Sequence, residues 1–265
     1  MGMKILKDIF PKVSELAVSV GNFIKEEAKD FDLNRVELKG SKSNLVSYVD
    51  KGAEERIVEG LQKLIPDSGF LTEENTVAQQ DKEFTWVIDP LDGTTNFVHG
   101  LPVYAVSIGL RYGDELVLGV IHEINRHETF RAYKGSGAFL NDTPIHVTPA
   151  TQIDESLFAT GFPIYNFEKL NDYLAILNQL MKNSHGLRRM GSAATDLAYV
   201  ACGRTEGFFE YNLSPWDVAA GIVIVREAGG TVTNFSGGAD ALLSREIVAA
   251  GPVHKELLEV IQKFW

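Results

Sequence analysis

The sequence predicts an α+β fold in its first half and an α/β fold in its second half. Between residues 104 and 140, apolar and polar residues alternate with period two, which is typical of antiparallel strands joined by short turns. From about residue 154 onward, short apolar runs alternate with segments of helical spacing, which is typical of α/β architectures. We therefore divide the chain into an N-terminal half, residues 1–147, and a C-terminal half, residues 148–265, without a flexible linker.

Length and composition narrow the class of protein. A chain of 265 residues with 45% hydrophobic and 23% charged residues is typical of a globular protein. No apolar run approaches the roughly 20 residues needed to cross a bilayer, and the N-terminus lacks the pattern of a signal peptide, so we expect no membrane contact. The net charge of -11 argues against direct nucleic-acid binding. The single cysteine, Cys202, excludes an internal disulfide and fits a cytoplasmic location.

The N-terminal half is expected to begin with two helices. Apolar residues at helical spacing predict a helix over residues 3–29, in which Pro11 indicates two helical pieces or a late start. After a polar turn at residues 38–44, an amphipathic helix is expected from Asp50 to about Leu64. Strands are then expected at residues 70–72, 84–88, 104–110, 116–121, 128–133 and 137–140.

The Gly135-Ser136-Gly137 sequence resembles a nucleotide-binding loop only superficially. It lies between two expected strands and no helix is expected after it, whereas the glycine-rich loops that bind nucleotides open a helix. We interpret it as a hairpin turn.

The C-terminal half is expected to alternate strands with helices. Ser214 followed by Pro215 is a strong start signal, because serine caps a helix and proline is favoured at the first helical position. The expected strands lie at residues 157–160, 185–188, 208–211, 231–233 and 247–250. The expected helices lie at residues 167–181, 193–202, 215–228 and 253–264.

One stretch, residues 86–97, combines the features of a metal site and a phosphate site. Asp89 and Asp92 bracket Pro90 at the end of an apolar run. Gly93 frees the backbone, and Thr94 can begin a short helix whose amide groups point outward. Carboxylates bind hard cations and helix amides bind anions, so both could meet here. The alternative is an ordinary turn in which an aspartate caps a helix.

Further acidic residues stand beside other apolar segments. Asp50 begins an expected helix, Glu73 and Glu74 end a short strand, and Asp217 lies in the first turn of the helix expected after Ser214. Taken singly, each could be an exposed residue or one that favours a helix N-terminus. If these residues and Asp89 are buried together, their carboxylates repel one another. Bound cations would lower the free-energy cost of burying these charges.

These motifs resemble the signatures of the inositol monophosphatase family. The resemblance rests on Glu73-Glu74, on residues 89–97 and on residues 215–230, which occur in the family's order over nearly the whole chain. Residues 39–50 and 188–194 fit as well, and the latter is most similar to bacterial members. The resemblance implies alternating helix and sheet layers, similar to the fructose-1,6-bisphosphatase fold, and a Mg²⁺-dependent phosphomonoesterase.

The resemblance also implies a site with two or three Mg²⁺ ions. The first ion would be held by Glu73, Asp89 and the backbone carbonyl of Leu91. The second would be held by Asp89, Asp92 and Asp217, and a weaker third by Glu73 and water. Two Mg²⁺ cancel the charge of the four carboxylates, and the charge of a phosphate ester would be balanced by a third ion or by Lys39 with helix amides.

For the reaction, the resemblance implies attack by a water molecule that the metal ions activate. Thr94 and Glu73 would orient or deprotonate this water, with Asp50 supporting Thr94. The amides of Gly93 and Thr94 would receive the phosphate oxygens. On the other side of the site, the hydroxyl groups of a polyol would face three residues: Asp92, Ala193 and Glu210.

Inositol 1-phosphate is the expected substrate, with a broader range of sugar or polyol phosphates left open. Phosphatases for NADP(H), fructose 1,6-bisphosphate or a 3′-phosphoadenosine nucleotide share the metal motifs and are alternatives. A phosphatase-like scaffold that acts through protein partners is an alternative from another class, and the family implies a homodimer. The histidines show no ligand spacing, so no zinc site is expected.

Overall fold

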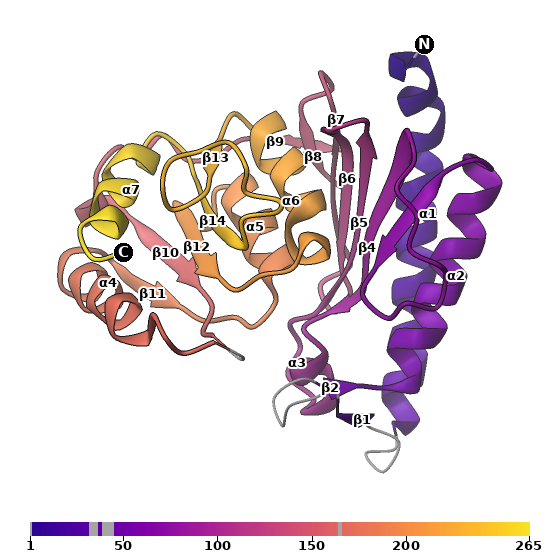
Figure 1. The fold of residues 1–265 in the computed structure, drawn as a ribbon, viewed down its shortest axis with the longest axis horizontal. Coiled ribbons are helices and arrows are strands. Elements are labelled where there is room, and N and C mark those ends of the chain that lie inside the picture. The colour runs from indigo at the N-terminus through magenta and orange to yellow at the C-terminus, as the bar shows by residue number, and fades with distance from the viewer. Residues whose placement is uncertain (1, 32–36, 39–44, 164–165) are drawn as a thin grey trace.

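Helices and sheets alternate in five layers. The computed structural model describes residues 2–31, 37–38, 45–163 and 166–265. Helices α1 (Gly2–Glu27) and α2 (Tyr48–Leu64) cover the outer face of a seven-stranded sheet (Figure 1). Helices α5 (Ala193–Ala201) and α6 (Pro215–Glu227) separate it from a five-stranded sheet. Helices α4 (Leu170–Asn183) and α7 (His254–Gln262) form the last layer. The predicted fold class is confirmed.

The first sheet is almost entirely antiparallel. Of its strands in the described residues, only β3 and β4 run parallel, and the following strands pair with their sequence neighbours as a meander. Its strands are β3 (Gly69–Thr72), β4 (Phe84–Asp92), β5 (Ala105–Tyr112), β6 (Glu115–Glu123), β7 (Glu128–Tyr133), β8 (Ala138–Leu140) and β9 (Thr143–Ile145). The sequence gives no expectation of β9. A separate pair is formed by β1 (Glu37–Leu38) and β2 (Leu45–Val46).

The second sheet is mixed, in the order β11-β10-β12-β14-β13. Strand β10 is parallel to β11 and to β12, while β14 is antiparallel to both of its neighbours. The strands are β10 (Leu157–Thr160), β11 (Gly186–Arg188), β12 (Gly207–Tyr211), β13 (Thr231–Thr233) and β14 (Glu246–Ala250). Short 3-10 helices lie at Ala28–Asp30 and Ile153–Glu155. The division into two domains at residue 147 stays a prediction.

Helices α1, α2 and α4 differ from their expected forms, and of these α4 begins at Leu170 rather than at residue 167 and ends at Asn183 rather than at residue 181. Pro11 does not divide α1: it lies on the exposed side, while Leu6, Ile9 and Val13 are buried opposite it. Burial of that face outweighs the one backbone hydrogen bond that proline removes. Helix α2 begins at Tyr48 rather than at Asp50, because Ser47 caps it and Asp50 closes a capping box. Residues 39–44 of the expected polar turn lie outside the described residues.

The glycine-rich turn between β7 and β8 is a hairpin, as predicted. The amides of Gly135 and Gly137 each donate a hydrogen bond of 2.9 Å to the carboxylate of Glu227. The turn amides that could have received a phosphate are therefore used within the fold.

Helix α6 lies directly on the first sheet at two glycines. Gly109 and Gly119 pair across β5 and β6, and the backbone of α6 packs over them at Ala219 and Ala220. A Cβ atom on Gly109 would lie 2.9 Å from the Cβ of Ala219, and one on Gly119 would overlap the carbonyl oxygen of Ala220. This close packing brings the N-terminus of α6 to the end of β4.

No helix in the described part of the chain has the length and apolar character that crossing a membrane requires.

Candidate active site

The end of β4 forms the base of the site. The sequence predicts that this strand ends at Ile88, but in the structure it continues through Pro90 to Asp92. Asp89 pairs with Ser107 and Asp92 with Ala105, so β4 carries one more residue than β5 in this interval. Such a bulge tolerates proline, because it interrupts the regular ladder of hydrogen bonds, and it bends the strand. Both aspartates are almost fully buried.

The turn after β4 leads into α3 (Thr94–Val98), the short helix that the sequence predicts. Gly93 has a φ of 95°, which a residue with a side chain rarely adopts. The hydroxyl of Thr94 lies 2.9 Å from Asp50 Oδ1 and 3.0 Å from the carbonyl oxygen of Leu91, and its single proton can be donated to either. The predicted partnership of Asp50 with Thr94 is thus present as a contact.

Ser47, at the start of α2, holds the side chain of Asp50 in place. Asp50 Oδ2 accepts hydrogen bonds from the amide of Ser47 at 2.9 Å and from the Ser47 hydroxyl at 2.6 Å. The side chain is fully buried, and burial raises its pKa although these hydrogen bonds and that of Thr94 oppose the shift. Asp50 stands behind Thr94 rather than among the residues that line the pocket.

Asp217 reaches the site from the first turn of α6. The amide of Ser214 donates to its Oδ2 at 2.7 Å, so the side chain closes the helix start as well as facing the pocket. The hydroxyl of Ser107, opposite Asp89, donates to the carbonyl of Trp216 at 3.4 Å. This contact ties the start of α6 to the strand next to β4.

Asp92 is fixed from the other half of the chain. Its Oδ2 accepts hydrogen bonds from the Ser192 hydroxyl at 2.6 Å and from the Ala194 amide at 2.7 Å, both at the N-terminus of α5. The resemblance places Ser192 within a matching segment, but the sequence does not indicate this contact.

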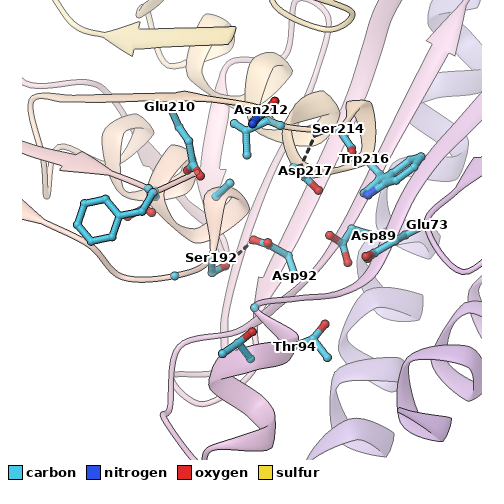
Figure 2. A pocket seen from close by; sticks show the side chains of 18 of the residues that line it. Glu73, Asp89, Asp92, Thr94, Ser192, Glu210, Asn212, Ser214, Trp216 and Asp217 are labelled. Carbon is cyan, nitrogen blue, oxygen red and sulfur yellow. Dashed lines mark hydrogen bonds between the residues drawn. The ribbon is translucent and has the colours of Figure 1, made fainter. Parts of the chain in front are cut away.

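One pocket of about 360 Å³ is lined by all of the predicted site residues except Asp50. Figure 2 shows that Glu73 lies beside Asp89 and that Asp92 and Asp217 face the same space. Glu210 lies at the far end of the pocket. The predicted residues that line the pocket are Glu73, Asp89, Leu91, Asp92, Gly93, Thr94, Ala193, Glu210 and Asp217. Lining residues that the sequence did not single out include Phe162 and Asp196.

The carboxylates at one end of the pocket repel one another. Burial raises the pKa of Asp89 well above its usual range, and the charges of Glu73, Asp92 and Asp217 raise it further. Burial also raises the pKa of Asp92 to about 6, against the opposing effect of its hydrogen bonds from α5. For Asp217, burial and the charges of Asp92 and Glu73 raise the pKa well above its usual range. A cation among these groups would stabilise their ionised forms.

The candidate ligand atoms suit a hard divalent cation, because all of them are oxygen atoms and most of them belong to carboxylates. The carbonyl oxygen of Leu91 has two lone pairs, so one remains for a metal ion even when the other accepts the Thr94 proton. Within the residues that the structure describes, no three acidic, histidine or cysteine side chains form a ready-made ligand group. Lys39, which was expected to help balance the phosphate charge, lies outside these residues. The assignment of individual ligands therefore stays a proposal.

The far end of the pocket surrounds Glu210, the last residue but one of β12. Burial raises the pKa of its carboxyl to about 8, against the opposing positive charge of Arg189. The carboxylate lies against Gly161 so closely that any Cβ atom there would overlap it. Asp196 is buried nearby, and its Oδ1 has no hydrogen-bond partner among the described residues. This end of the pocket thus offers acceptors to hydroxyl groups.

Known proteins resemble this chain in sequence and fold over almost its full length. The inositol-1-monophosphatase of Mesorhizobium japonicum is 39% identical over 251 residues, 94% of each chain. The Nus factor SuhB of Pasteurella multocida is 42% identical over 248 residues, 93% of this chain and 92% of that protein.

Solved structures of related proteins have a similar fold. The suhB protein of Bartonella henselae has a TM-score of 0.88 at 40% identity, over 94% of this chain and 96% of that one. The inositol monophosphatase of Anabaena has a TM-score of 0.87 at 34% identity, over 98% and 97%. The sequence model of the inositol monophosphatase family matches this chain over residues 7–265. The chain belongs to the inositol monophosphatase family, a membership that supports phosphatase activity.

Proposed function

We propose that this protein is a Mg²⁺-dependent phosphatase whose main substrate is inositol 1-phosphate, with other sugar or polyol phosphates as further substrates. One observation carries the proposal: four carboxylates, those of Glu73, Asp89, Asp92 and Asp217, line one pocket beside a threonine that contacts a buried aspartate. A pocket with this charge favours cations, and cations allow it to receive a phosphate. The name of one relative, the inositol-1-monophosphatase of Mesorhizobium japonicum, supports the choice of substrate.

In this proposal Asp89 would contribute to both of the principal ion sites. Glu73 and the Leu91 carbonyl would complete the first site, and Asp92 and Asp217 would complete the second. Bound Mg²⁺ supplies positive charge for the attacking and leaving oxygens and lowers the pKa of water. The hydrogen bonds that Asp92 and Asp217 accept from α5 and α6 hold the carboxylates in place before any ion arrives.

Thr94 is the residue that we propose orients the attacking water. When its hydroxyl proton is donated to Asp50, the oxygen of Thr94 is left as an acceptor. A water molecule that donates a proton to this oxygen would keep a lone pair free to attack the phosphorus. Glu73, at the same end of the pocket, is the second candidate to orient the water or to take its proton.

The direct test is phosphate release from a panel of compounds. We expect release to require Mg²⁺, to stop when EDTA is added, and to be fastest with inositol 1-phosphate. The panel also contains fructose 1,6-bisphosphate, NADP⁺ and 3′-phosphoadenosine 5′-phosphate, the substrates of the alternative enzymes. Fastest release from one of these would keep the mechanism and change the substrate. No release from any compound at any Mg²⁺ concentration would contradict a phosphatase.

A second prediction concerns recognition of the polyol. We expect Glu210→Ala to raise the KM for inositol 1-phosphate roughly two- to tenfold, because a hydrogen bond between the Glu210 carboxyl group and a substrate hydroxyl is lost. The same variant should hydrolyse p-nitrophenyl phosphate, which lacks hydroxyl groups, with a KM close to that of the unsubstituted protein. Steady-state kinetics with both compounds check this. An equal change for the two substrates would contradict a role of Glu210 in recognising hydroxyls.

A scaffold that acts through protein partners is the second candidate, because several relatives are called Nus factor SuhB. Association with a protein partner that persists in an Asp89→Asn variant without phosphatase activity would establish this role. The homodimer and the cytoplasmic location stay predictions from the sequence.

A further inference from the structure

A buried glutamate behind the pocket organises the loop that carries Glu73. Glu54, in the middle of α2, has no exposed surface. One of its carboxylate oxygens accepts hydrogen bonds from the hydroxyl of Thr72 at 2.9 Å and from the amide and hydroxyl of Thr76 at 2.7 Å each. The other oxygen accepts from the amide of Glu74 at 2.7 Å. A single side chain thus receives four hydrogen bonds from one short loop.

Glu73 lies within this loop, between two residues that are bound to Glu54, namely Thr72 and Glu74. The amide of Glu73 donates to the carbonyl of Ile88 at 3.2 Å, which attaches the loop to β4 one residue before Asp89. The backbone is therefore held on both sides of Glu73, and the side chain lines the pocket.

The charge of Glu54 suits this task. A buried carboxylate is costly unless donors satisfy it, and hydrogen bonds to a carboxylate are stronger than those between neutral groups. Two of its four donors are backbone amides, whose hydrogen bonds fix the path of the chain itself. Since Glu54 is not among the residues that line the pocket, it reaches the chemistry only through this loop.

We propose that Glu54 is a positioning residue that holds Glu73 ready to bind a divalent cation. This inference rests on the proposed function, in which Glu73 is a metal ligand. A loop fixed in advance lowers the entropy that must be lost when an ion binds, so Glu54 strengthens Mg²⁺ binding without touching the ion.

The variant Glu54→Gln tests the proposal with little change in shape. A glutamine can keep an oxygen toward the two threonines, but its amide group then faces the amide of Glu74, where two donors oppose each other. We expect Mg²⁺ to bind about 10- to 100-fold more weakly, as measured by calorimetry with Mg²⁺ alone and no substrate. At saturating Mg²⁺, kcat should fall by a smaller factor than the Mg²⁺ affinity, because an ion bound to Glu73 would itself help to hold that side chain in place.

Glu55→Gln is the matched control. Glu55 is the next residue of the same helix and is exposed, so this variant removes the same charge without touching the loop. Its Mg²⁺ affinity should equal that of the unsubstituted protein. Thermal unfolding of both variants in EDTA separates a loss of stability from a loss of metal affinity.

Unchanged Mg²⁺ affinity in Glu54→Gln, with or without a lower Tm, would overturn the proposal and leave Glu54 a purely structural residue. If Glu54→Gln does not fold, Thr76→Val replaces it: Thr76 is exposed, and the change removes one of the four donors. Here we expect Mg²⁺ binding to weaken about two- to tenfold, and no weakening would overturn the proposal. Failure of the unsubstituted protein to bind Mg²⁺ would instead remove the proposed function itself, together with the role of Glu54.

Discussion

Asp217→Asn is expected to abolish turnover while leaving the fold intact. Asp217 is one of the proposed ligands of the second ion, and a neutral amide is a weaker ligand for Mg²⁺ than a carboxylate. Loss of an outer partner of a metal ligand already costs about 10- to 100-fold, so loss of a ligand should lower kcat on the order of 1,000-fold. Phosphate release from inositol 1-phosphate at saturating Mg²⁺ measures the effect.

The fold should survive because asparagine keeps the oxygen that closes the start of α6. The amide of Ser214 donates to Asp217 Oδ2, and the side-chain oxygen of asparagine can accept the same hydrogen bond. Asp172→Asn is a suitable control, since Asp172 also stands third in its helix, α4, but outside the lining of the pocket. Near-normal kcat in Asp217→Asn would contradict the assignment of Asp217 as a ligand.

The sequence could reveal the candidate ligands because each of them lies in a local motif. Asp89 and Asp92 flank Pro90, and Asp217 follows Ser214 and Pro215, so turn and helix-start signals mark the positions. The structure adds that these signals are compatible with a second role. Asp217 closes a helix start and faces the pocket with the same side chain, so the capping alternative and the ligand hypothesis do not exclude each other.

Contacts between distant residues could not be predicted in this way. Ser192 and Asp92 are 100 positions apart, and no local pattern indicates that α5 would hold the end of β4. Glu54 looks like any acidic residue of an amphipathic helix until the loop after β3 folds over it. Pro90 suggests the end of a strand, but the bulge between β4 and β5 gives it a place within one. In each case a tertiary contact decides what the local sequence leaves open.

Gly119→Ala is expected to damage stability and activity together. A methyl group on Gly119 would overlap the backbone carbonyl of Ala220, and backbone cannot rotate away as a side chain can. Overpacking of this kind costs about 1–3 kcal/mol, and each kcal/mol lowers the Tm of a protein of this size by about 2–4 °C. To relieve the overlap, α6 must move away from the first sheet, and it carries Asp217 with it. Since a misplacement of about 1 Å can cost 100-fold in rate, kcat/KM should fall by up to about that factor.

Gly52→Ala separates this effect from the general consequences of replacing a glycine. Gly52 lies in α2, where the nearest atoms to an added Cβ are side-chain atoms at 3.4 Å, and alanine is the better helix former. That variant should keep or slightly raise the Tm and should not change kcat/KM. Equal behaviour of the two variants would contradict this role of Gly119. A selective loss in Gly119→Ala would show instead that Gly119 sets the distance between Asp217 and the carboxylates of β4. The geometry of the proposed metal site would then depend on how closely one helix can approach one sheet.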